Sequence, residues 1–573
     1  MTWQQTYEQW LAFQKMDESL EQQLRQLSEE ESQEAFGQRL SFGTAGMRGV
    51  LGPGINRMNI YTVRQATEGL AQLIKSQGPE AEKKGVVIAY DSRHMSPEFA
   101  MEAAKVLANH HIKAYVYESL RPTPVLSFAV RHLAASAGIM ITASHNPSEY
   151  NGYKVYGSDG GQMPPEDSDR LTEFVNGVDN PLTVGVANQT DALATQLIEF
   201  IGDEVDQTYL KEIQTVTVNP KLIESMQDKI KIVYTPLHGT GLYLGEKALK
   251  QAGFEQIYLV EEQVKPDGDF PTVSSPNPES IEAFAYAEKL ATLVEADIIL
   301  ATDPDADRLG AMVLNAEGNY QLLTGNQIAS LMLDYLLKAL DEANQLPKNG
   351  VVIKSMVSTD LVNHLMAAYS LETIEVLTGF KFIAEKIKEY EQTQEKTFLL
   401  GFEESYGYLI KPFTRDKDAI QALVLLAELT VYYKDKGKTL GQALNDLYQS
   451  YDYFTEITHA VVFPGISGAI QMKELMVSVR EHPKDHLGDN PIVQWIDYNQ
   501  QVMKTLDGNL VPLKLPKANA LKYHLADGSW FAIRPSGTEP KLKLYVGAKG
   551  KTERDSKNKA SMMIDHLQSW FNA

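Results

Sequence analysis

The sequence predicts three similar α/β units with parallel or mostly parallel sheets, followed by a fourth segment of different character. Three observations support this: a length of 573 residues, short apolar runs that alternate with helical patterns, and a threefold recurrence of that order. A chain of this length is too long for one hydrophobic core, and three to four domains are expected. Strands that alternate with helices are typical of βαβ units.

The first unit follows a charge-rich, amphipathic helical segment over residues 1–40. Its strands are expected at 86–90, 114–117 and 139–141, and its helices at 97–109 and 124–133. Ser96 is the expected N-cap of the first of these helices, with Pro97 at the first helical position. Together these elements give the order βαβαβ.

The same order recurs twice more. The second unit has expected strands at 231–234, 257–260 and 297–301 and helices ending at 252 and spanning 278–294, while the third has strands at 351–354, 375–377 and 397–400. In each unit the third strand leads into a polar motif. Because open α/β sheets bind ligands at the carboxyl ends of their strands, three such motifs predict one cleft shared by three domains.

The fourth segment begins near residue 453 and has strand-like runs at 530–533 and 542–545. The predicted domains are 1–205 with a serine motif, 206–318 with an acidic motif, 319–452 with a Glu-Glu-Ser motif, and 453–573 with an Arg-Pro-Ser-Gly motif.

Composition excludes several classes of function. The net charge of −22 argues against a general binder of nucleic acids or anionic membranes, although a cleft can oppose the global sign. The absence of cysteine excludes disulfides, thiolate chemistry and Cys-ligated zinc. The start shows no basic segment followed by an apolar one, and no run approaches the roughly 18 apolar residues of a membrane span. The chain is therefore expected in the cytoplasm.

The serine motif is "TASHNPSEYNGYK", directly after the third strand of the first unit. Ser144 stands where a strand becomes a tight turn, so it is expected to be exposed and rigidly aimed, as a nucleophile or phosphate carrier requires. The surroundings are not the Gly-x-Ser-x-Gly of hydrolases. The alternative is a structural turn closed by Asn146 and Pro147.

The acidic motif is "TDPDADR", with Asp303, Asp305 and Asp307 at every second position. On extended backbone such residues point the same way, so three carboxylates are expected on one face. Their mutual repulsion is relieved by a hard divalent cation, and Mg²⁺ is expected where phosphate is present. The alternative is a solvated acidic turn.

Two further motifs have side chains of the kinds that bind sugar hydroxyls and phosphate. "GFEESYG" offers Glu403, Glu404 and Ser405 for hydrogen bonds to sugar hydroxyls, and its alternative is a charged helix N-terminus.

"RPSGTEPK" offers the Arg534 guanidinium, the Ser536 and Thr538 hydroxyls, and Gly537, which lets backbone amides approach a phosphate. Its alternative is a surface turn. The Gly-rich "FGTAGMRG" ends in Arg48 and is a weak signal alone.

Together and in this order, the five motifs resemble those of the α-D-phosphohexomutase family, which includes phosphoglucomutases and phosphomannomutases. They extend from about residue 40 to about residue 550, nearly the whole chain. The resemblance implies four domains around a central cleft: three α/β domains with mixed, mostly parallel sheets and a smaller C-terminal α+β domain.

The resemblance also implies roles. Ser144 would carry the phosphate and join Asp303, Asp305 and Asp307 at Mg²⁺. The other implied site residues are Lys154 as general acid/base, Arg48 and His145 beside the reacting centre, Arg308 near it, Lys381 in the cleft, Glu403 and Ser405 at the sugar, and Arg534, Ser536, Gly537 and Thr538 at the phosphate that is not transferred. The chain departs from shorter members of the family, which have a histidine after the Ser-Gly of the sugar loop, because it reads Ser405-Tyr406-Gly407-Tyr408.

The reaction implied is interconversion of glucose 1-phosphate and glucose 6-phosphate, with glucose 1,6-bisphosphate as intermediate and activator. Mannose or pentose phosphates as substrates, a phosphatase that hydrolyses the phosphoserine, and a non-catalytic sugar-phosphate sensor are the alternatives. The expected partner is a small hexose phosphate, with no nucleic acid and no membrane, and the chain is expected to be a monomer or homodimer.

Overall fold

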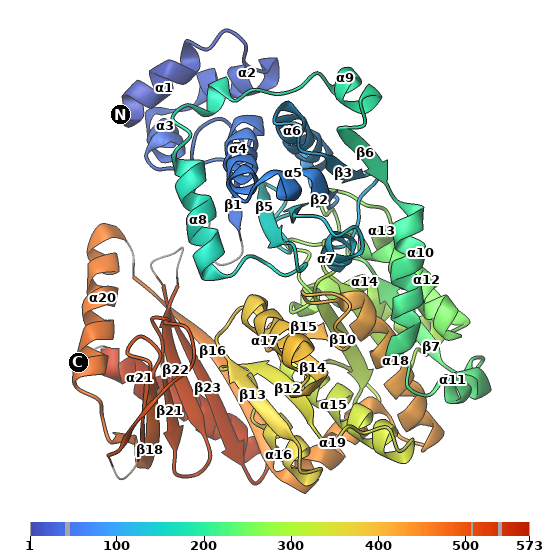
Figure 1. Cartoon of the computed structure of the whole chain (residues 1–573). Helices are drawn as coiled ribbons and strands as arrows, with labels where there is room; N and C mark the ends of the chain where they lie inside the picture. Colours follow the sequence, from blue (N-terminus) through green and yellow to red (C-terminus); the bar gives the residue numbers. More distant parts are fainter. Residues whose placement is uncertain (1, 41–45, 464, 506–507, 537–540, 572–573) are drawn as a thin grey trace.

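The computed structural model describes residues 2–40, 46–463, 465–505, 508–536 and 541–571. These residues form four sheets that follow one another along the chain (Figure 1). The domain boundaries given above stay a prediction.

The first sheet has the order β1-β5-β4-β2-β3-β6. Its strands are β1 (Met47–Val50), β2 (Val86–Tyr90), β3 (Ala114–Tyr117), β4 (Ala137–Ile141), β5 (Tyr150–Gly157) and β6 (Ile198–Ile201). Strand β2 pairs in parallel with β3 and β4, whereas β5 returns antiparallel to β4. The sheet is therefore mixed, and the serine motif occupies the turn between β4 and β5.

The second and third sheets repeat this arrangement. Their orders are β11-β10-β9-β7-β8 and β13-β12-β14-β15. The strands are β7 (Lys231–Thr235), β8 (Gln256–Leu259), β9 (Ile298–Thr302), β10 (Leu309–Leu314), β11 (Tyr320–Leu322), β12 (Gly350–Ser355), β13 (Glu372–Val376), β14 (Thr397–Glu403) and β15 (Gly407–Leu409). In each, the third strand pairs in parallel with the first and the next strand returns antiparallel. The prediction of three α/β units whose third strand leads into a polar motif is confirmed.

Two helix starts differ from expectation. Helix α6 (Ser96–Asn109) has Met95 as its N-cap, in a left-handed conformation with φ of 64°. The Ser96 hydroxyl instead donates to Asp91 Oδ1 at 2.8 Å, so the prediction of Ser96 as N-cap was wrong.

The helix expected at 278–294 begins only at Ala285, as α14 (Ala285–Val294), after a 3₁₀ turn at Ile281–Phe284. The preceding residues are held in a turn, because the Glu279 amide donates to the Asn277 side chain at 3.1 Å, and side chains of this kind compete with helical hydrogen bonding.

The first three sheets share one continuous core. Helices α7 (Thr123–His132), α12 (Gly241–Ala252), α15 (Gly325–Glu342) and α18 (Ala419–Asp435) all contribute buried side chains to it. Helix α18 is buried on all sides, and its Glu428 accepts hydrogen bonds from the amides of Val218 and Asn219 and from the Tyr335 hydroxyl. The loops of these three units therefore stand in set positions relative to one another. No helix in the described ranges combines the length and apolar character of a bilayer span.

The C-terminal domain has a different construction. Its main sheet is antiparallel, in the order β16-β23-β22-β21-β18-β19-β20, and lies beside the third sheet (Figure 1). The strands are β16 (Tyr453–Val462), β18 (Asn490–Asp497), β19 (Val502–Thr505), β20 (Leu510–Pro512), β21 (Leu521–Leu525), β22 (Trp530–Pro535) and β23 (Lys541–Gly550). Helices α20 (Gly465–Glu481) and α21 (Glu553–Phe571) pack on it through Met476 and Leu567. This confirms the α+β prediction.

The N-terminal helical segment is also as expected. Helices α1 (Trp3–Leu11), α2 (Glu18–Gln26) and α3 (Glu29–Phe36) bury an aromatic group formed by Trp10 and Phe36, which packs against Tyr61 of the first domain.

Candidate active site

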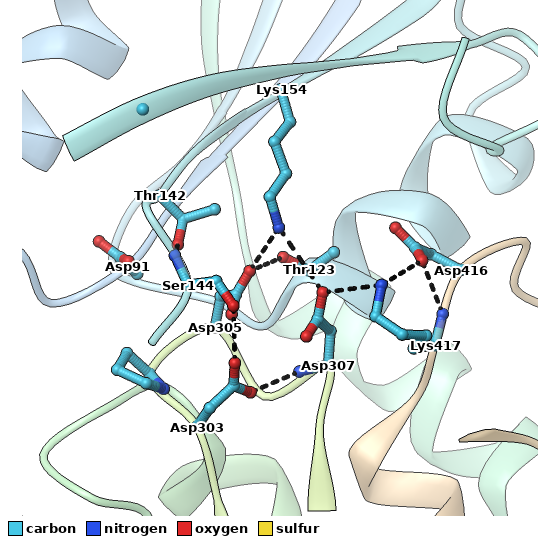
Figure 2. Close-up of polar contacts among 12 residues, drawn as sticks. Asp91, Thr123, Thr142, Ser144, Lys154, Asp303, Asp305, Asp307, Asp416 and Lys417 are labelled. Carbon is cyan, nitrogen blue, oxygen red and sulfur yellow. Dashed lines mark hydrogen bonds and ion pairs between the residues drawn. The ribbon is translucent and has the colours of Figure 1, made fainter. Parts of the chain in front are cut away.

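Ser144 occupies a strained position in the turn after β4. Its φ is 54°, in the left-handed region that non-glycine residues seldom adopt, and such strain is common at functional sites. Its amide donates to Thr142 Oγ1 at 2.8 Å, and its hydroxyl donates to Asp303 Oδ2 at 2.8 Å (Figure 2). Ser144 is only 1% exposed, so the prediction of an exposed serine was wrong. The acidic loop of the second domain covers it.

The three aspartates lie in the loop between β9 and β10. The expected extended backbone was wrong: residues 304–306 form a turn and bend, and Ala306 has φ of 48°. The turn nevertheless brings the carboxylates together, with one ligand oxygen of each within 4.8 Å of the others. The amides of Asp307 and Arg308 donate to Asp303 Oδ1 at 3.1 and 3.0 Å and orient that side chain.

The electrostatics of this cluster favour a dication. Burial, together with the charges of Asp305 and Asp307, raises the pKa of Asp303 well above its usual range. Burial also acts to raise the pKa of Asp305, but the Lys154 ammonium outweighs it and holds that pKa below its usual range. One oxygen each of Asp305 and Asp307, Oδ1, is buried without a hydrogen-bond partner. Buried orphan oxygens in an all-oxygen donor set fit a hard cation such as Mg²⁺.

Two buried lysines, Lys154 and Lys417, contact the aspartates. Lys154, on β5, donates from Nζ to Asp305 Oδ2 at 2.8 Å and lies 3.6 Å from Asp307 Oδ2 (Figure 2). Lys417 lies 3.1 Å from Asp307 Oδ2 and donates to Asp416 Oδ1 at 3.0 Å. The site thus holds a second ammonium.

Sequence reasoning missed Lys417. Burial lowers its pKa, but the surrounding carboxylates, Asp307 first, outweigh burial and raise it above the usual range. The available signal was the charged run "RDKD" directly before the apolar helix α18, which is weak by itself because charged residues often precede a helix.

The expected arginines and histidine surround the serine. Arg48, on β1, donates from Nη1 to Asn146 Oδ1 at 3.1 Å, and Arg308 donates from Nη1 to Glu279 Oε1 at 2.6 Å. Nε of each arginine is buried without a hydrogen-bond partner, so both can still donate to an anionic acceptor. His145 Nδ1 lies 3.2 Å from Ser144 Oγ, and burial together with Arg308 and Arg48 keeps its pKa well below the usual range. The imidazole is therefore neutral at neutral pH.

The Glu-Glu-Ser motif forms the turn of the β14–β15 hairpin, so the helix N-terminus alternative was wrong. Glu403 accepts from the Gly379 amide at 2.7 Å, and Glu404 accepts from the Ser355 hydroxyl at 2.7 Å. Burial raises the pKa of Glu403, although Lys417 opposes the shift. Ser405 is half-buried in the same turn.

A cavity of about 550 Å³ lies beyond this motif, between the first, third and fourth domains. It is lined from α17 (Phe380–Thr393) by Lys381, from the end of β22 by Arg534 and Ser536, and from α8 (Pro165–Asn176) by Asp169. Lys473 and Lys517 also line it. Burial and the neighbouring Arg534 charge lower the pKa of Lys381.

Among the described residues, the cavity lining carries four cationic side chains and one carboxylate, although the chain as a whole is acidic. Gly537 and Thr538 lie outside the described residues.

The described site residues therefore form three groups. Ser144, His145, Arg48, Lys154, Arg308 and the three aspartates meet at one centre, where Lys417, Thr123, Glu279, Asp91 and Arg93 are additional members that the motifs did not indicate. Lys381, Arg534 and Ser536 line the distal cavity, and Glu403 and Ser405 belong to the hairpin of the third domain.

The chain belongs to the phosphoglucomutase/phosphomannomutase family. Models of this family match at residues 39–181 (alpha/beta/alpha domain I), 207–317 (domain II), 324–451 (domain III) and 489–563 (C-terminal domain). A phosphoglucomutase of Staphylococcus epidermidis is 40% identical over 533 residues, 93% of this chain and 95% of that relative. One from Staphylococcus aureus is 39% identical over 541 residues, 94% and 95% of the two chains.

A solved structure with the same fold is that of a putative phosphomannomutase from Thermus thermophilus, with a TM-score of 0.67 and 20% identity over 94% of this chain and all of that one. The chain is thus a member of a class of sugar-phosphate mutases. The four sheets described above agree with the fold of that family.

Proposed function

We propose that this chain acts as a phosphoglucomutase: it interconverts glucose 1-phosphate and glucose 6-phosphate through phosphoserine at Ser144 and glucose 1,6-bisphosphate. The observation that carries the proposal is the Ser144 hydroxyl, 2.8 Å from Asp303 in a cluster of three buried carboxylates. Relatives that match over nearly their full length carry the name phosphoglucomutase, and this supports glucose as the sugar in our proposal.

The reacting centre has the groups that phosphoryl transfer requires. Mg²⁺, held by Asp303, Asp305, Asp307 and Ser144, would supply charge compensation for the transferring phosphoryl group. The unpartnered Nε groups of Arg48 and Arg308 donate to phosphoryl oxygens as negative charge develops. Lys154 is the general acid/base, since its buried Nζ faces the same cluster. As the neutral amine, Nζ takes the proton of the attacking sugar hydroxyl and becomes the ammonium, and it returns that proton to the leaving sugar oxygen in the second half-reaction.

The distal cavity holds the phosphate that is not transferred. The Arg534 fork and the Ser536 hydroxyl bind it, with Lys381 close by. Glu403 and Ser405 contact sugar hydroxyls. Because one clamp must accept the 1-phosphate and the 6-phosphate in turn, it recognises phosphate and not the sugar, and the bisphosphate reorients between the two half-reactions.

Substrate preference follows from the hydroxyl contacts. Glu403 and Ser405 would bind a hydroxyl pair that glucose and mannose share, so we expect glucose phosphates to be preferred and mannose phosphates to be tolerated less well. Pentose phosphates should be used poorly, because unpaired polar groups in the site cost about 1–3 kcal/mol each. The setting we propose is the cytoplasm, which the cysteine-free composition supports, and the oligomeric state we propose is a monomer or homodimer.

The test is a coupled assay of Ser144→Ala with glucose 1-phosphate, Mg²⁺ and a trace of glucose 1,6-bisphosphate. Loss of the nucleophile should lower turnover by about 10,000-fold or more. Ser136→Ala is the matched control, because its hydroxyl lies in the same domain and only donates to the Ala81 carbonyl. Intact mass should show phosphate on the wild type and the control but not on Ser144→Ala.

Two results would contradict the proposal. Labelled phosphate retained by Ser144→Ala would move the phosphoryl carrier to another residue. Phosphate release from glucose 1-phosphate without isomerisation would identify a phosphatase.

A further inference from the structure

Arg93 is a buried arginine that contacts the loop carrying Ser144. None of the sequence motifs indicated this arginine. Its side chain is 0% exposed. Nη1 donates to the carbonyls of Pro147 and Tyr150 at 2.7 and 3.1 Å, and Nη2 donates to the carbonyls of Ser144, at 2.6 Å, and Asn146. Four carbonyls of the serine loop, which we define as residues 142–150, therefore converge on one guanidinium.

This arrangement is unusual for an ion pair. The nearest carboxylate, Asp91, lies 3.5 Å from Nε, and neither Asp91 Oδ2 nor Arg93 Nε has a hydrogen-bond partner. The hydrogen bonds of the Arg93 guanidinium are thus directed at backbone carbonyls, and Asp91 is hydrogen-bonded by the Arg93 amide instead, at 3.0 Å to Oδ1. A planar fork with five donors can satisfy four acceptors in this geometry, whereas a lysine ammonium has three donors at one point.

A segment of the second domain covers Arg93. The Phe270 ring lies against the guanidinium, with the Arg93 Cζ 5.0 Å from the ring centroid. Gly268 approaches so closely that an added Cβ would stand 2.8 Å from the His94 amide nitrogen. Further along the same segment, the Ser275 hydroxyl donates to the His145 carbonyl at 2.8 Å. The serine loop is therefore held from inside by Arg93 and from outside by residues 268–275.

We propose that Arg93 is a positioning residue for phosphoryl transfer: it holds the carbonyls of the serine loop and so keeps the strained Ser144 in place, with its hydroxyl beside Asp303. Phe270 secures the guanidinium and makes the loop geometry depend on the contact between the first two domains. The inference rests on the proposed function, since it concerns the same serine. It assigns Arg93 no contact with substrate.

Arg93→Lys keeps the charge and removes the fork. We expect kcat for glucose 1-phosphate to fall about 100-fold, because a displacement of about 1 Å at a reacting group has an effect of this size. KM should stay within about twofold, because the sugar and its distal phosphate bind on the other side of the cleft. Arg64→Lys is the matched control: Arg64 pairs with Glu102 at 2.6 Å in the same domain, and both constants should be unchanged. A kcat within twofold of wild type, or a rise confined to KM, would overturn the proposal.

Phe270→Leu provides a second route if Arg93→Lys does not fold. Loss of the ring should lower kcat about fivefold, and the double variant should lose less than the product of the single effects, since contacting residues couple. An unchanged kcat in Phe270→Leu would refute the proposal that the second domain, through Phe270, helps to position the serine loop.

Amide hydrogen exchange separates this inference from the proposed function. Exchange of peptides over residues 143–150 should quicken in Arg93→Lys while peptides over α4 (Ile60–Ser76) stay protected. A wild-type chain without mutase activity would overturn the proposed function, and the exchange comparison would then decide whether Arg93 holds the loop. Unchanged exchange in residues 143–150 would overturn the inference.

Discussion

The reacting centre and the distal cavity, which we call the reacting end and the distal end of the site, are built differently. At the reacting end, Ser144, Asp303, Asp305 and Asp307 are all at most 2% exposed and are tied to one another or to buried lysines. At the distal end, Arg534 and Ser536 line a cavity of about 550 Å³ into which Lys381, Lys473 and Lys517 also face.

The difference matches the tasks of the two ends. Phosphoryl transfer requires alignment to a fraction of an ångström, so the reacting groups must be held before substrate arrives. Under the proposed function, the distal end would accept a phosphate at either position of the sugar and release it for reorientation. Changes at the reacting end should therefore lower kcat, and changes at the distal end should raise KM. The predictions below follow this distinction, from the largest expected effect to the smallest.

Asp305→Asn should affect the reacting end most. Alteration of groups that merely orient a metal ligand costs about 10–100-fold, so loss of a charged ligand should lower kcat about 1,000-fold and raise the Mg²⁺ concentration required. Activity would be measured across a Mg²⁺ titration. Asp446→Asn, which alters an exposed pair with Lys438, is the control. Full activity of wild-type enzyme after treatment with EDTA would refute the metal site.

Lys417→Met tests the lysine that only the structure revealed. It leaves Asp307 and Asp416 buried without their shared cation, and breaking such a pair typically costs about 3–5 kcal/mol of stability. We expect kcat to fall about 100-fold, because Asp307 is displaced within the cluster. The measurements are kcat and thermal unfolding, with Lys438→Met as the exposed counterpart. Normal turnover in a folded variant would show that Asp307 does not depend on Lys417.

Arg534→Lys tests the distal end. It retains the charge but loses the bidentate fork, so KM should rise about tenfold for glucose 1-phosphate and glucose 6-phosphate alike, with kcat little changed. Steady-state kinetics in both directions would measure this. A defect for one isomer alone would contradict a clamp that serves both phosphates.

Glu456→Gln tests the contact between the third and fourth domains. Glu456 lies on β16 in a cavity between the third and fourth domains, and burial raises its pKa to about 7. In the unfolded chain the Glu456 carboxyl ionises near its ordinary pKa of 4.5, whereas in the folded protein it stays neutral up to about pH 7. The free energy of unfolding therefore falls as pH rises from about 4.5 through 7.

The wild type should therefore lose a few degrees more Tm between pH 5 and pH 8 than Glu456→Gln, since about 1 kcal/mol corresponds to roughly 1 °C for a chain of 573 residues. Thermal unfolding at the two pH values is the measurement. Equal losses in both proteins would exclude Glu456 as the source.

Much of the fold was accessible from local pattern. The strands at 86–90 and 114–117 were predicted to the residue, and the three polar motifs do stand after β4, β9 and β14. Apolar runs and helical periodicity depend on neighbours in the chain, which is why they can be recognised without a tertiary structure. The chemical types of the site residues could also be predicted from the sequence, because serine, carboxylates, lysine and arginine have few roles when they occur together in such motifs.

The sequence by itself thus determined the α/β units, their order and the reactive residue types. Only the tertiary structure decided that Ser144 is buried, that a turn and not extended backbone gathers the aspartates, and that Lys417 and Arg93 belong to the centre. The hydroxyl of Ser144 meets a carboxylate 159 positions away, and the fork of Arg93 meets carbonyls more than 50 positions away. Such contacts depend on how distant segments pack, and packing leaves no periodic signal in the residues that it brings together.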